Sequence, residues 1–240
     1  MLKIDSLENK KVLFWKKLKE KKYRDEENLF IVEGDHSVNE ALSHNIVKEV
    51  ISLDDIDTSC DCYLVSEKIM KLLTNQVTSP RIMAVCYKLK EEEVRGKVLI
   101  LDNIQDPGNL GTIIRSAVAF NFKNIILSND SVDLYNPKVI RSTEGLLFNI
   151  NILRRDLKTE IVNLKNKGYH IIGSSLNTDN YIINDVTDIA LIIGNEGNGI
   201  KKEILEMCDE VIKIPISLQC ESLNAGVAAS ILMYEMRNYQ

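Results

Sequence analysis

A series of short apolar runs in the C-terminal part of the chain constrains the fold more than any other feature. The runs are rich in isoleucine, leucine and valine and occupy residues 98–102, 124–128, 170–175, 189–194 and 210–216. Such runs are typical of strands buried on both faces of a parallel sheet. Helical patterns separate them at residues 110–120, 158–167, 201–208 and 223–237. The alternation predicts an α/β domain with a mostly parallel sheet.

The N-terminal part repeats this alternation on a smaller scale. Strand patterns lie at residues 28–34, 47–53, 62–66 and 81–89, with helical patterns near 12–18, 37–42 and 67–75. The charged stretch Lys88–Lys97 lacks apolar periodicity and is the best boundary candidate. We therefore predict a small α/β domain at residues 1–90 and a larger one at 97–240.

Charge is distributed unevenly along the chain. The net charge is −5, yet residues 1–24 hold nine basic and three acidic side chains. Such a patch gains affinity for phosphates by releasing counterions. We interpret it as an RNA-binding surface, with a solvated helix face as the alternative. The cations predicted to contact RNA here are Lys10, Lys11, Lys17, Lys21, Lys22 and Arg24.

Composition argues against several classes of protein. No apolar run reaches the ~18 residues that a membrane helix needs, and the start of the chain resembles no secretory signal, so we expect a cytoplasmic protein. Five cysteines offer only a lone C-x-C at Cys60 and Cys62, and the three histidines are scattered. We therefore predict no metal site.

The first candidate motif is "LDNIQDPGNLGTIIRS", residues 101–116. It lacks both GxxxxGK[ST] and GxGxxG, which excludes the usual triphosphate and dinucleotide sites. Asn109 is predicted to cap the following helix. Arg115 lies four residues beyond Gly111, so its side chain is expected to lean back toward the turn. A cation near a helix N-terminus is unfavourable, which indicates a functional role, although a plain surface arginine fits the spacing too.

Two further motifs follow strands. In "IALIIGNEGNGI", residues 189–200, three glycines surround Glu196 at the carboxyl end of a strand, where α/β sheets bind ligands. An ordinary glycine turn is the alternative. In "SLNAGVAAS", residues 222–230, Ser222 is a plausible N-cap and the small residues after it invite close contact with another helix or a flat ligand.

These three blocks, in this order, resemble the SpoU (TrmH) family of RNA ribose 2′-O-methyltransferases. The resemblance covers residues 102–117, the G-x-E-x-x-G of residues 194–199, and Ile214-Pro215 followed by Ser222-Leu223-Asn224. A weaker block, "NPKVIRSTEGLLF", carries Arg141 where the family has R-x-S-x-G. The N-terminal "KYRDEENLFIVEG" is similar to the family's substrate-binding domain, which itself resembles RNA-binding ribosomal proteins. Ile216, Thr143 and Gly226 replace the commoner methionine, serine and serine.

The resemblance implies a fold, a cofactor and a set of site residues. The C-terminal domain would be a SPOUT methyltransferase with a deep trefoil knot, homodimeric, with S-adenosylmethionine (AdoMet) bound in the knot. The implied catalytic residues are Arg115, Asn109, Glu196, Ser222 and Asn224. The implied cofactor-binding residues are Gly194, Asn195, Ile214, Leu223, Ser222 and Asn224, and Arg141 joins the RNA-binding set.

The implied activity is AdoMet-dependent methylation of a ribose 2′-hydroxyl. In the family's proposed mechanism the arginine is a base, but a guanidinium keeps its proton in proteins. We favour Arg115 as a group that holds a phosphate and stabilises the emerging alkoxide. The ribosomal-protein-like half favours large-subunit ribosomal RNA over tRNA. A non-catalytic ribosome-assembly factor is the rival interpretation, and it would be marked by loss of Arg115, Glu196 or Asn224, all of which are present.

Overall fold

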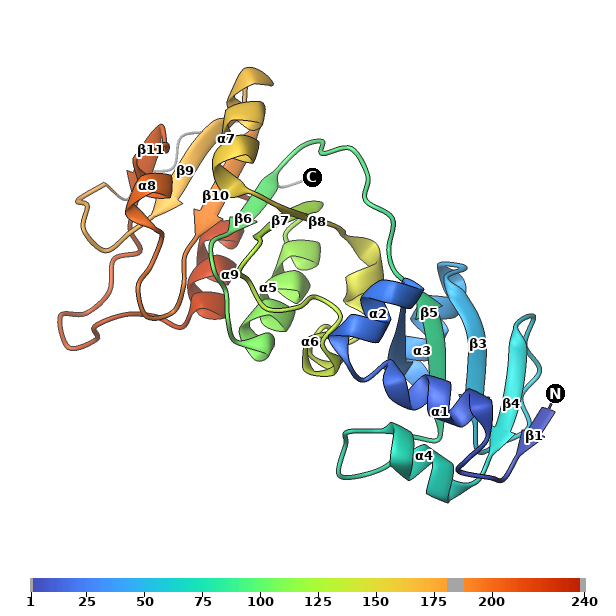
Figure 1. Ribbon diagram of the computed structural model, residues 1–240. Coiled ribbons are helices and arrows are strands. Elements are labelled where there is room, and N and C mark those ends of the chain that lie inside the picture. The colour runs from blue at the N-terminus through green and yellow to red at the C-terminus, as the bar shows by residue number, and fades with distance from the viewer. Residues whose placement is uncertain (1, 181–187, 238–240) are drawn as a thin grey trace. The chain divides into compact units, whose positions relative to one another are not determined.

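The computed structural model describes residues 2–180 and 188–237, and its elements are labelled in Figure 1. The strands are β1 (Leu2–Ile4), β2 (Leu29–Glu33), β3 (Val47–Ser52), β4 (Asp61–Val65), β5 (Ile82–Tyr87), β6 (Val98–Leu101), β7 (Asn124–Ser128), β8 (Asn151–Arg155), β9 (His170–Ser174), β10 (Ile189–Ile193) and β11 (Glu210–Ile212). The helices are α1 (Lys10–Lys17), α2 (Lys21–Glu27), α3 (Asp35–Ser43), α4 (Glu67–Leu73), α5 (Pro107–Ala119), α6 (Pro137–Ser142), α7 (Leu157–Asn166), α8 (Lys202–Leu205) and α9 (Ala225–Glu235), with a 3-10 turn at Leu146–Asn149.

The chain forms two compact units. Unit 1 comprises Met1–Lys90 and Asp133–Phe148, and unit 2 comprises Glu91–Val132 and Asn149–Gln240. The segment Asp133–Phe148 thus packs in unit 1, although it lies inside the predicted C-terminal domain. Two contacts explain this, because Tyr135 stacks on Phe30 with 4.7 Å between ring centroids and Asp133 pairs with Arg24 at 2.6 Å.

In unit 1, five described strands form a mixed sheet in the order β1-β4-β3-β5-β2. The first three run parallel, and β5 is antiparallel to β3 and β2. Helices α1 and α4 bury Trp15, Ile69 and Leu73 against it. The Trp15 indole donates a 2.9 Å hydrogen bond to Glu49, a buried carboxylate that also pairs with Lys11 at 2.5 Å. The strands and helices of unit 1 thus enclose a hydrophobic core of their own.

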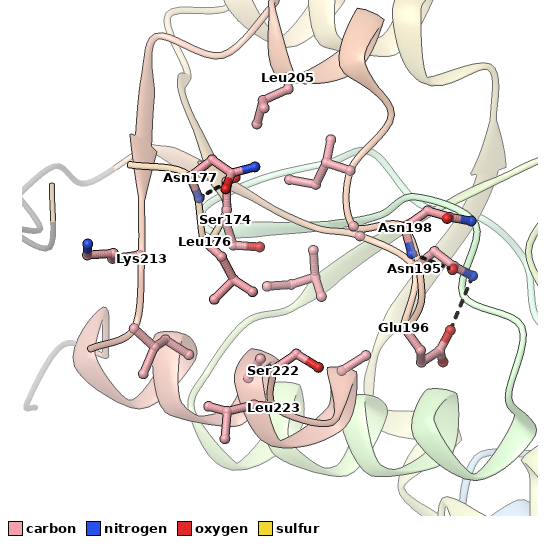
Figure 2. A pocket seen from close by; sticks show the side chains of 18 of the residues that line it. Ser174, Leu176, Asn177, Asn195, Glu196, Asn198, Leu205, Lys213, Ser222 and Leu223 are labelled. Atoms are coloured by element: carbon pink, nitrogen blue, oxygen red, sulfur yellow. Dashed lines mark hydrogen bonds between the residues drawn. The ribbon is translucent and has the colours of Figure 1, made fainter. Parts of the chain in front are cut away.

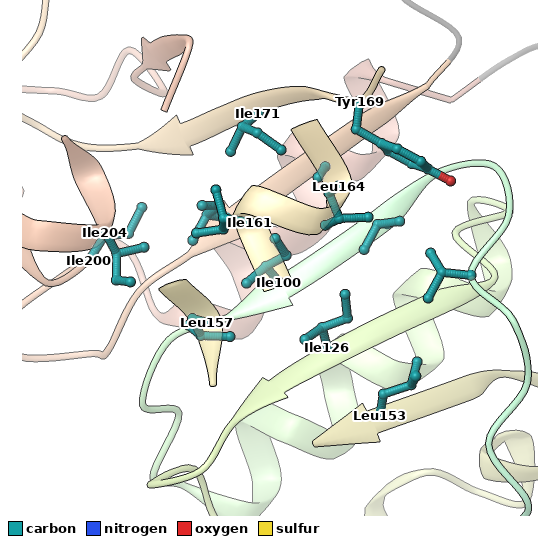
Figure 3. Close-up of a cluster of buried hydrophobic side chains, with 14 residues drawn as sticks. Ile100, Ile126, Leu153, Leu157, Ile161, Leu164, Tyr169, Ile171, Ile200 and Ile204 are labelled. Carbon is teal, nitrogen blue, oxygen red and sulfur yellow. The ribbon is translucent and has the colours of Figure 1, made fainter. Parts of the chain in front are cut away.

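In unit 2, six described strands form a parallel sheet in the order β11-β9-β10-β6-β7-β8. Helix α7 covers one face, and its Ile161 packs among Ile100, Ile126 and Ile192 (Figure 3). Helices α5 and α9 lie on the other side of the sheet (Figure 1). The parallel α/β architecture predicted from the apolar runs is confirmed.

Some elements were missed by the sequence analysis, namely β1, α2, α6 and β8. Strand β8 forms an edge of its sheet, and only Leu153 of its residues is buried. An edge strand that buries so little lacks the apolar run by which the central strands were recognised. Among the described residues, no helix is both long and apolar enough to cross a membrane.

Two predicted helix caps are wrong by a few residues. The N-cap of α5 is Asp106, which accepts a 2.8 Å hydrogen bond from the backbone of Asn109, and Pro107 occupies the first helical turn. The N-cap of α9 is Asn224 rather than Ser222, since the Asn224 side chain accepts from the backbone of residues 226 and 227. Both shifts leave Asn109 and Asn224 with side-chain amides facing the loops at the sheet edge.

Candidate active site

The loop after β10 is built by backbone contacts that only glycine permits. Asn195 and Gly199 exchange backbone hydrogen bonds of 3.0 and 2.9 Å, which folds the loop back on itself. A Cβ on Gly194 would lie 2.1 Å from the backbone of Gly199 and Ile200. The loop therefore closes tightly against the end of its own strand, and residue 194 must lack a side chain.

Asn195 fastens this loop at both ends. Its side-chain oxygen accepts from the backbone N–H groups of Gly197 and Asn198, at 2.9 and 3.2 Å. Its amide nitrogen donates 2.9 Å to the carbonyl of Asn103, which follows β6. The glycine loop is thus tied to the neighbouring strand end, and the Asn195 amide also donates 3.3 Å to the carboxylate of Glu196.

Three of the predicted catalytic side chains form a continuous chain of hydrogen bonds. The amide of Asn224 donates to the Asn109 carbonyl oxygen at 2.8 Å, and the Asn109 amide donates to Glu196 at 2.7 Å. Asn224 in turn uses its oxygen to cap α9. Glu196 lies 87 positions after Asn109 in the sequence, and Asn224 lies 115 positions after it. The two hydrogen bonds nevertheless fix the orientation of the three side chains relative to one another.

The small residues of α9 serve helix packing. A Cβ on Gly226 would lie 3.2 Å from the side chain of Thr112 on α5, and the hydroxyls of Ser116 and Ser230 are 2.7 Å apart. A second helix therefore covers part of this small face, and Ala225 and Ala228 also line the pocket described below, so the flat ligand that the sequence left open stays a prediction. The packing sets α9, and with it Asn224, directly against α5.

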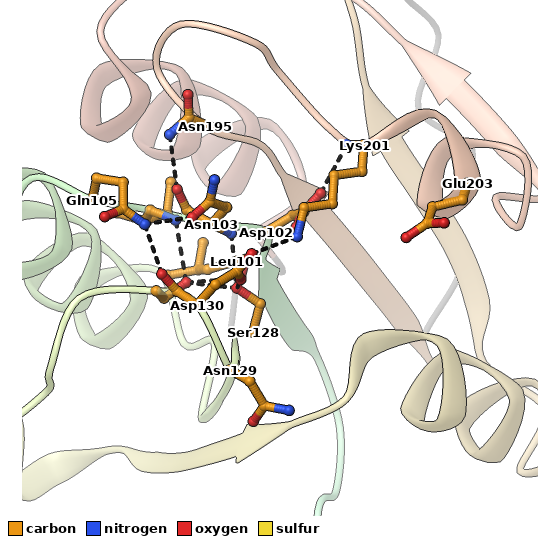
Figure 4. A network of polar contacts seen from close by, with 12 residues as sticks. Leu101, Asp102, Asn103, Gln105, Ser128, Asn129, Asp130, Asn195, Lys201 and Glu203 are labelled. Atoms are coloured by element: carbon orange, nitrogen blue, oxygen red, sulfur yellow. Dashed lines mark hydrogen bonds and ion pairs between the residues drawn. The ribbon is translucent and has the colours of Figure 1, made fainter.

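A polar network supports the same edge of the sheet (Figure 4). Asp102, 1% exposed, accepts a 2.8 Å hydrogen bond from the Lys201 backbone and lies 3.5 Å from its ammonium group. That ammonium also pairs with Asp130 at 2.5 Å. The hydrogen bond from Lys201, with another from Ser128, holds the pKa of Asp130 below its usual value, and the contact raises the pKa of Lys201. Lys201 thus anchors the far end of the glycine loop to the ends of β6 and β7.

A pocket of about 760 Å³ opens beside the glycine loop (Figure 2). This volume lies within the range of small-molecule sites. Leu176 and Asn177 line it from the segment after β9, Glu196 from the glycine loop, and Ser222 and Leu223 from the segment before α9. Apolar side chains, two carboxylates, three lysines and the backbone of the glycine loop therefore border one space.

Most of the predicted cofactor residues line this pocket. They are Gly194, Asn195, Ile214, Ser222 and Leu223, together with Glu196 from the predicted catalytic set. Asn224 does not itself line the pocket, although its neighbours Leu223 and Ala225 do. The sequence analysis did not include Ser174, Ser175, Leu176 and Asn177. They follow a strand adjacent to β10, so the rule that ligands bind at the carboxyl ends of parallel strands was the available signal.

Arg115 stands apart from the rest of the predicted catalytic set. It lies on the exposed side of α5, and no hydrogen bond or ion pair joins it to Asn109, Glu196 or Asn224. The spacing predicts that its side chain leans back toward the turn that opens α5, but no hydrogen bond or ion pair joins its guanidinium to that turn in the described part of the chain. Within residues 2–180 and 188–237 it has no charged partner, so it is free to meet an incoming group.

The predicted RNA-binding cations differ in their surroundings. Lys10 and Lys17 are exposed and form no ion pair in the described part of the chain. Lys11 pairs with Glu49, Lys21 with Asp25 at 2.5 Å and Lys22 with Glu26 at 3.9 Å.

The structure corrects the placement of Arg24. It is only 4% exposed, donates to the carbonyls of Leu18 and Lys19 at 2.9 and 2.6 Å, and pairs with Asp133. A guanidinium held in this way joins segments of unit 1 and offers nothing to a phosphate.

The described residues contain no group of three or more histidine, cysteine, aspartate or glutamate side chains placed to hold a metal ion.

Comparisons with known proteins found matches along most of the chain. Residues 96–234 match the model of the SpoU rRNA methylase family, and residues 9–84 match that of the MRM3-like substrate binding domain. The 23S rRNA (guanosine(2553)-2′-O)-methyltransferase RlmP of Bacillus subtilis is 41% identical over 99% of this chain and 100% of its own length.

Solved structures of similar proteins share the fold. An RNA methyltransferase of the TrmH family from Porphyromonas gingivalis superposes with a TM-score of 0.86 and 29% identity, covering 97% of this chain and 98% of its own. An AdoMet-bound rRNA methyltransferase from Sinorhizobium meliloti superposes with a TM-score of 0.88 and 26% identity, covering 98% and 96%. The likeness spans both units.

Proposed function

Because this chain belongs to the SpoU rRNA methylase family, and is an AdoMet-dependent RNA 2′-O-methyltransferase, we propose that its substrate is a ribose in large-subunit ribosomal RNA. The observation that carries the proposal is the 41% identity to a 23S rRNA methyltransferase along the whole of both chains. The match of residues 9–84 to a substrate binding domain supports it. We place the reaction in the cytoplasm.

The pocket beside the glycine loop suits AdoMet. Leu176, Ile214 and Leu223 would offer apolar surface to the adenosyl group, and the glycines of the loop would let it lie close to the backbone. The carboxylate of Glu196 favours the positive sulfonium. When bound, AdoMet supplies the methyl group that is transferred from sulfur to oxygen.

We assign the acceptor side of the site to the hydrogen-bonded chain of Asn109, Glu196 and Asn224. Because each of these side chains is held by the next, their positions are fixed before substrate arrives. Arg115 completes the site when RNA is present, with its exposed guanidinium on a phosphate and on the developing alkoxide. Ser222, at the pocket wall, contacts the cofactor or the ribose.

Two finer features belong to the same proposal. The C-terminal segment threads a trefoil knot around the cofactor; the sheet order supports this, because β10 lies between β9 and β6 while the chain returns to β11 beyond β9. The enzyme acts as a homodimer. Val227, Ile231 and Tyr234 of α9 leave apolar surface exposed, from 36% to 46%, which a second copy would cover.

The substrate assignment is tested by mapping ribose methylation in cells that lack this protein. We expect one 2′-O-methyl group of 23S ribosomal RNA to disappear, and the guanosine modified by the Bacillus subtilis relative is the first position to examine. The wild-type chain should restore it, and a chain with Arg115→Ala should not. Loss confined to tRNA would reassign the substrate, and unchanged methylation with defective ribosome assembly would favour the non-catalytic rival.

The basic helix α1 gives a second prediction. The double change Lys10→Glu and Lys17→Glu should weaken RNA binding and lower the slope of log Kd against log salt by about 1 per lysine, because phosphate contacts are lost. Filter binding between about 50 and 200 mM salt measures the slope. The double change Lys68→Glu and Lys167→Glu, at two exposed positions outside α1, is the charge-matched control. An equal slope in wild type and double variant would remove α1 from the RNA footprint.

A further inference from the structure

Unit 1 contains a second cavity, of about 180 Å³, that the methyl-transfer reaction does not use. Its walls come from the end of β2, from α3, from the segment after α4 and from α6. Ile31 and Ile140 supply apolar surface. The polar residues that border it are Glu33, Ser37, Asn75, Gln76, Asn136, Lys138 and Arg141. A space of this size admits one flat ring system, and its lining is rich in hydrogen-bonding groups.

One side of the cavity is cationic. Lys138 and Arg141 are three residues apart on α6, so they project from one face of the helix. Both are exposed, and neither forms an ion pair or a side-chain hydrogen bond within residues 2–180 and 188–237. Two such cations are suited to a phosphate, and the planar guanidinium of Arg141 can bind it through two N–H groups.

The other side carries a carboxylate that is already held in place. One oxygen of Glu33 accepts hydrogen bonds from the Thr74 hydroxyl at 2.5 Å and the Gln76 amide at 2.8 Å. Its other oxygen has no hydrogen-bond donor among the described residues. A carboxylate repels phosphate, but it accepts from N–H groups on the edge of a base. Guanine, with adjacent N1–H and N2–H donors, matches it better than uracil, which has a single N–H and no amino group.

We propose that this cavity binds one unpaired guanosine nucleotide of the substrate RNA, with its phosphate at Lys138 and Arg141 and its base edge at Glu33. Unpaired bases are the part of RNA that proteins read through hydrogen bonds. The inference rests on the proposed RNA substrate but concerns a different site from the AdoMet pocket. It gives unit 1 a means of selecting sequence as well as charge.

Nucleotide titration of the full-length protein tests the site directly, without any methylation assay. We expect GMP to perturb the NMR signals of the cavity residues and to bind at least about tenfold more tightly than UMP, as one bidentate contact provides. Glu33→Gln should remove the preference for GMP, because the amide keeps one acceptor oxygen, which Thr74 and Gln76 would engage, and would turn an NH2 donor toward the N–H groups of the base. Thermal unfolding of each variant checks that it folds.

Kinetics with the ribosomal RNA substrate give the second test. The double change Lys138→Ala and Arg141→Ala should raise KM for RNA and lower the salt slope by about 2, while the Kd for AdoMet stays the same. Lys68→Ala, an exposed lysine on α4 outside the cavity, is the control. Equal binding of GMP and UMP, or an unchanged KM and slope in the double variant, would overturn the proposal. Failure of the substrate assignment itself would appear instead as absent methylation with nucleotide binding intact.

Discussion

Arg115→Ala is expected to lower methyl transfer by about 10²–10³-fold while AdoMet still binds. A ribose hydroxyl is a weak nucleophile, and its oxygen gains negative charge as it loses its proton during attack. The guanidinium of Arg115 is the charged donor that we assign to that oxygen and to the neighbouring phosphate. Because this cation does not line the AdoMet pocket, its removal should leave the cofactor's affinity unchanged.

Single-turnover methylation with tritiated AdoMet measures the rate, and isothermal titration measures cofactor binding. Arg95→Ala is a matched control, since Arg95 is an exposed arginine of the same unit whose side chain pairs only with Glu93 in the described structure. Wild-type turnover in the Arg115 variant would remove Arg115 from the mechanism and leave the chain of Asn109, Glu196 and Asn224 to act without it.

Gly194→Ala should weaken AdoMet binding by about 5- to 150-fold, which corresponds to about 1–3 kcal/mol of overpacking. The added methyl would lie 2.1 Å from the backbone of residues 199 and 200, and backbone cannot rotate away as a side chain can. The loop must therefore open, and the amides that border the pocket move with it. Turnover at low AdoMet concentration should fall in proportion.

Gly197→Ala is the control variant. It shows whether replacing any glycine of the loop weakens AdoMet binding, or only replacing Gly194. A Cβ at Gly197 meets only the Asn195 side-chain oxygen, at 3.5 Å, which is ordinary contact. We expect its AdoMet affinity to stay close to wild type. Circular dichroism and thermal unfolding establish that both variants fold. A folded Gly194 variant with wild-type affinity would show that this loop does not shape the cofactor site.

Much of the site could be predicted from sequence because its signals are local. The family resemblance of short motifs implied a cofactor site at Gly194, Asn195, Ile214, Ser222, Leu223 and Asn224, and all of these except Asn224 line one pocket. The roles of the catalytic residues remain predictions. The cap positions were wrong by two or three residues, because Asp106 and Asn109, or Ser222 and Asn224, are equally good caps by residue type.

Contacts between distant parts of the chain left no comparable signal. Arg24 belongs by sequence to the basic patch, yet tertiary packing buries it against Asp133, a residue more than a hundred positions away. The same packing draws residues 133–148 into unit 1. Neither result follows from periodicity or composition, which describe neighbours in sequence only.

The sequence by itself determined the parallel α/β class, the order of the strands and helices other than β1, α2, α6 and β8, and the three blocks that carry the chemistry, because apolar periodicity and glycine turns act over a few residues. Only the tertiary structure decided that Asn224, Asn109 and Glu196 form one hydrogen-bonded chain. It alone decided that α9 packs on α5 through its small residues, and that Arg115 stands free of this chain. The physical reason is that each of these outcomes depends on which strands lie side by side in the sheet.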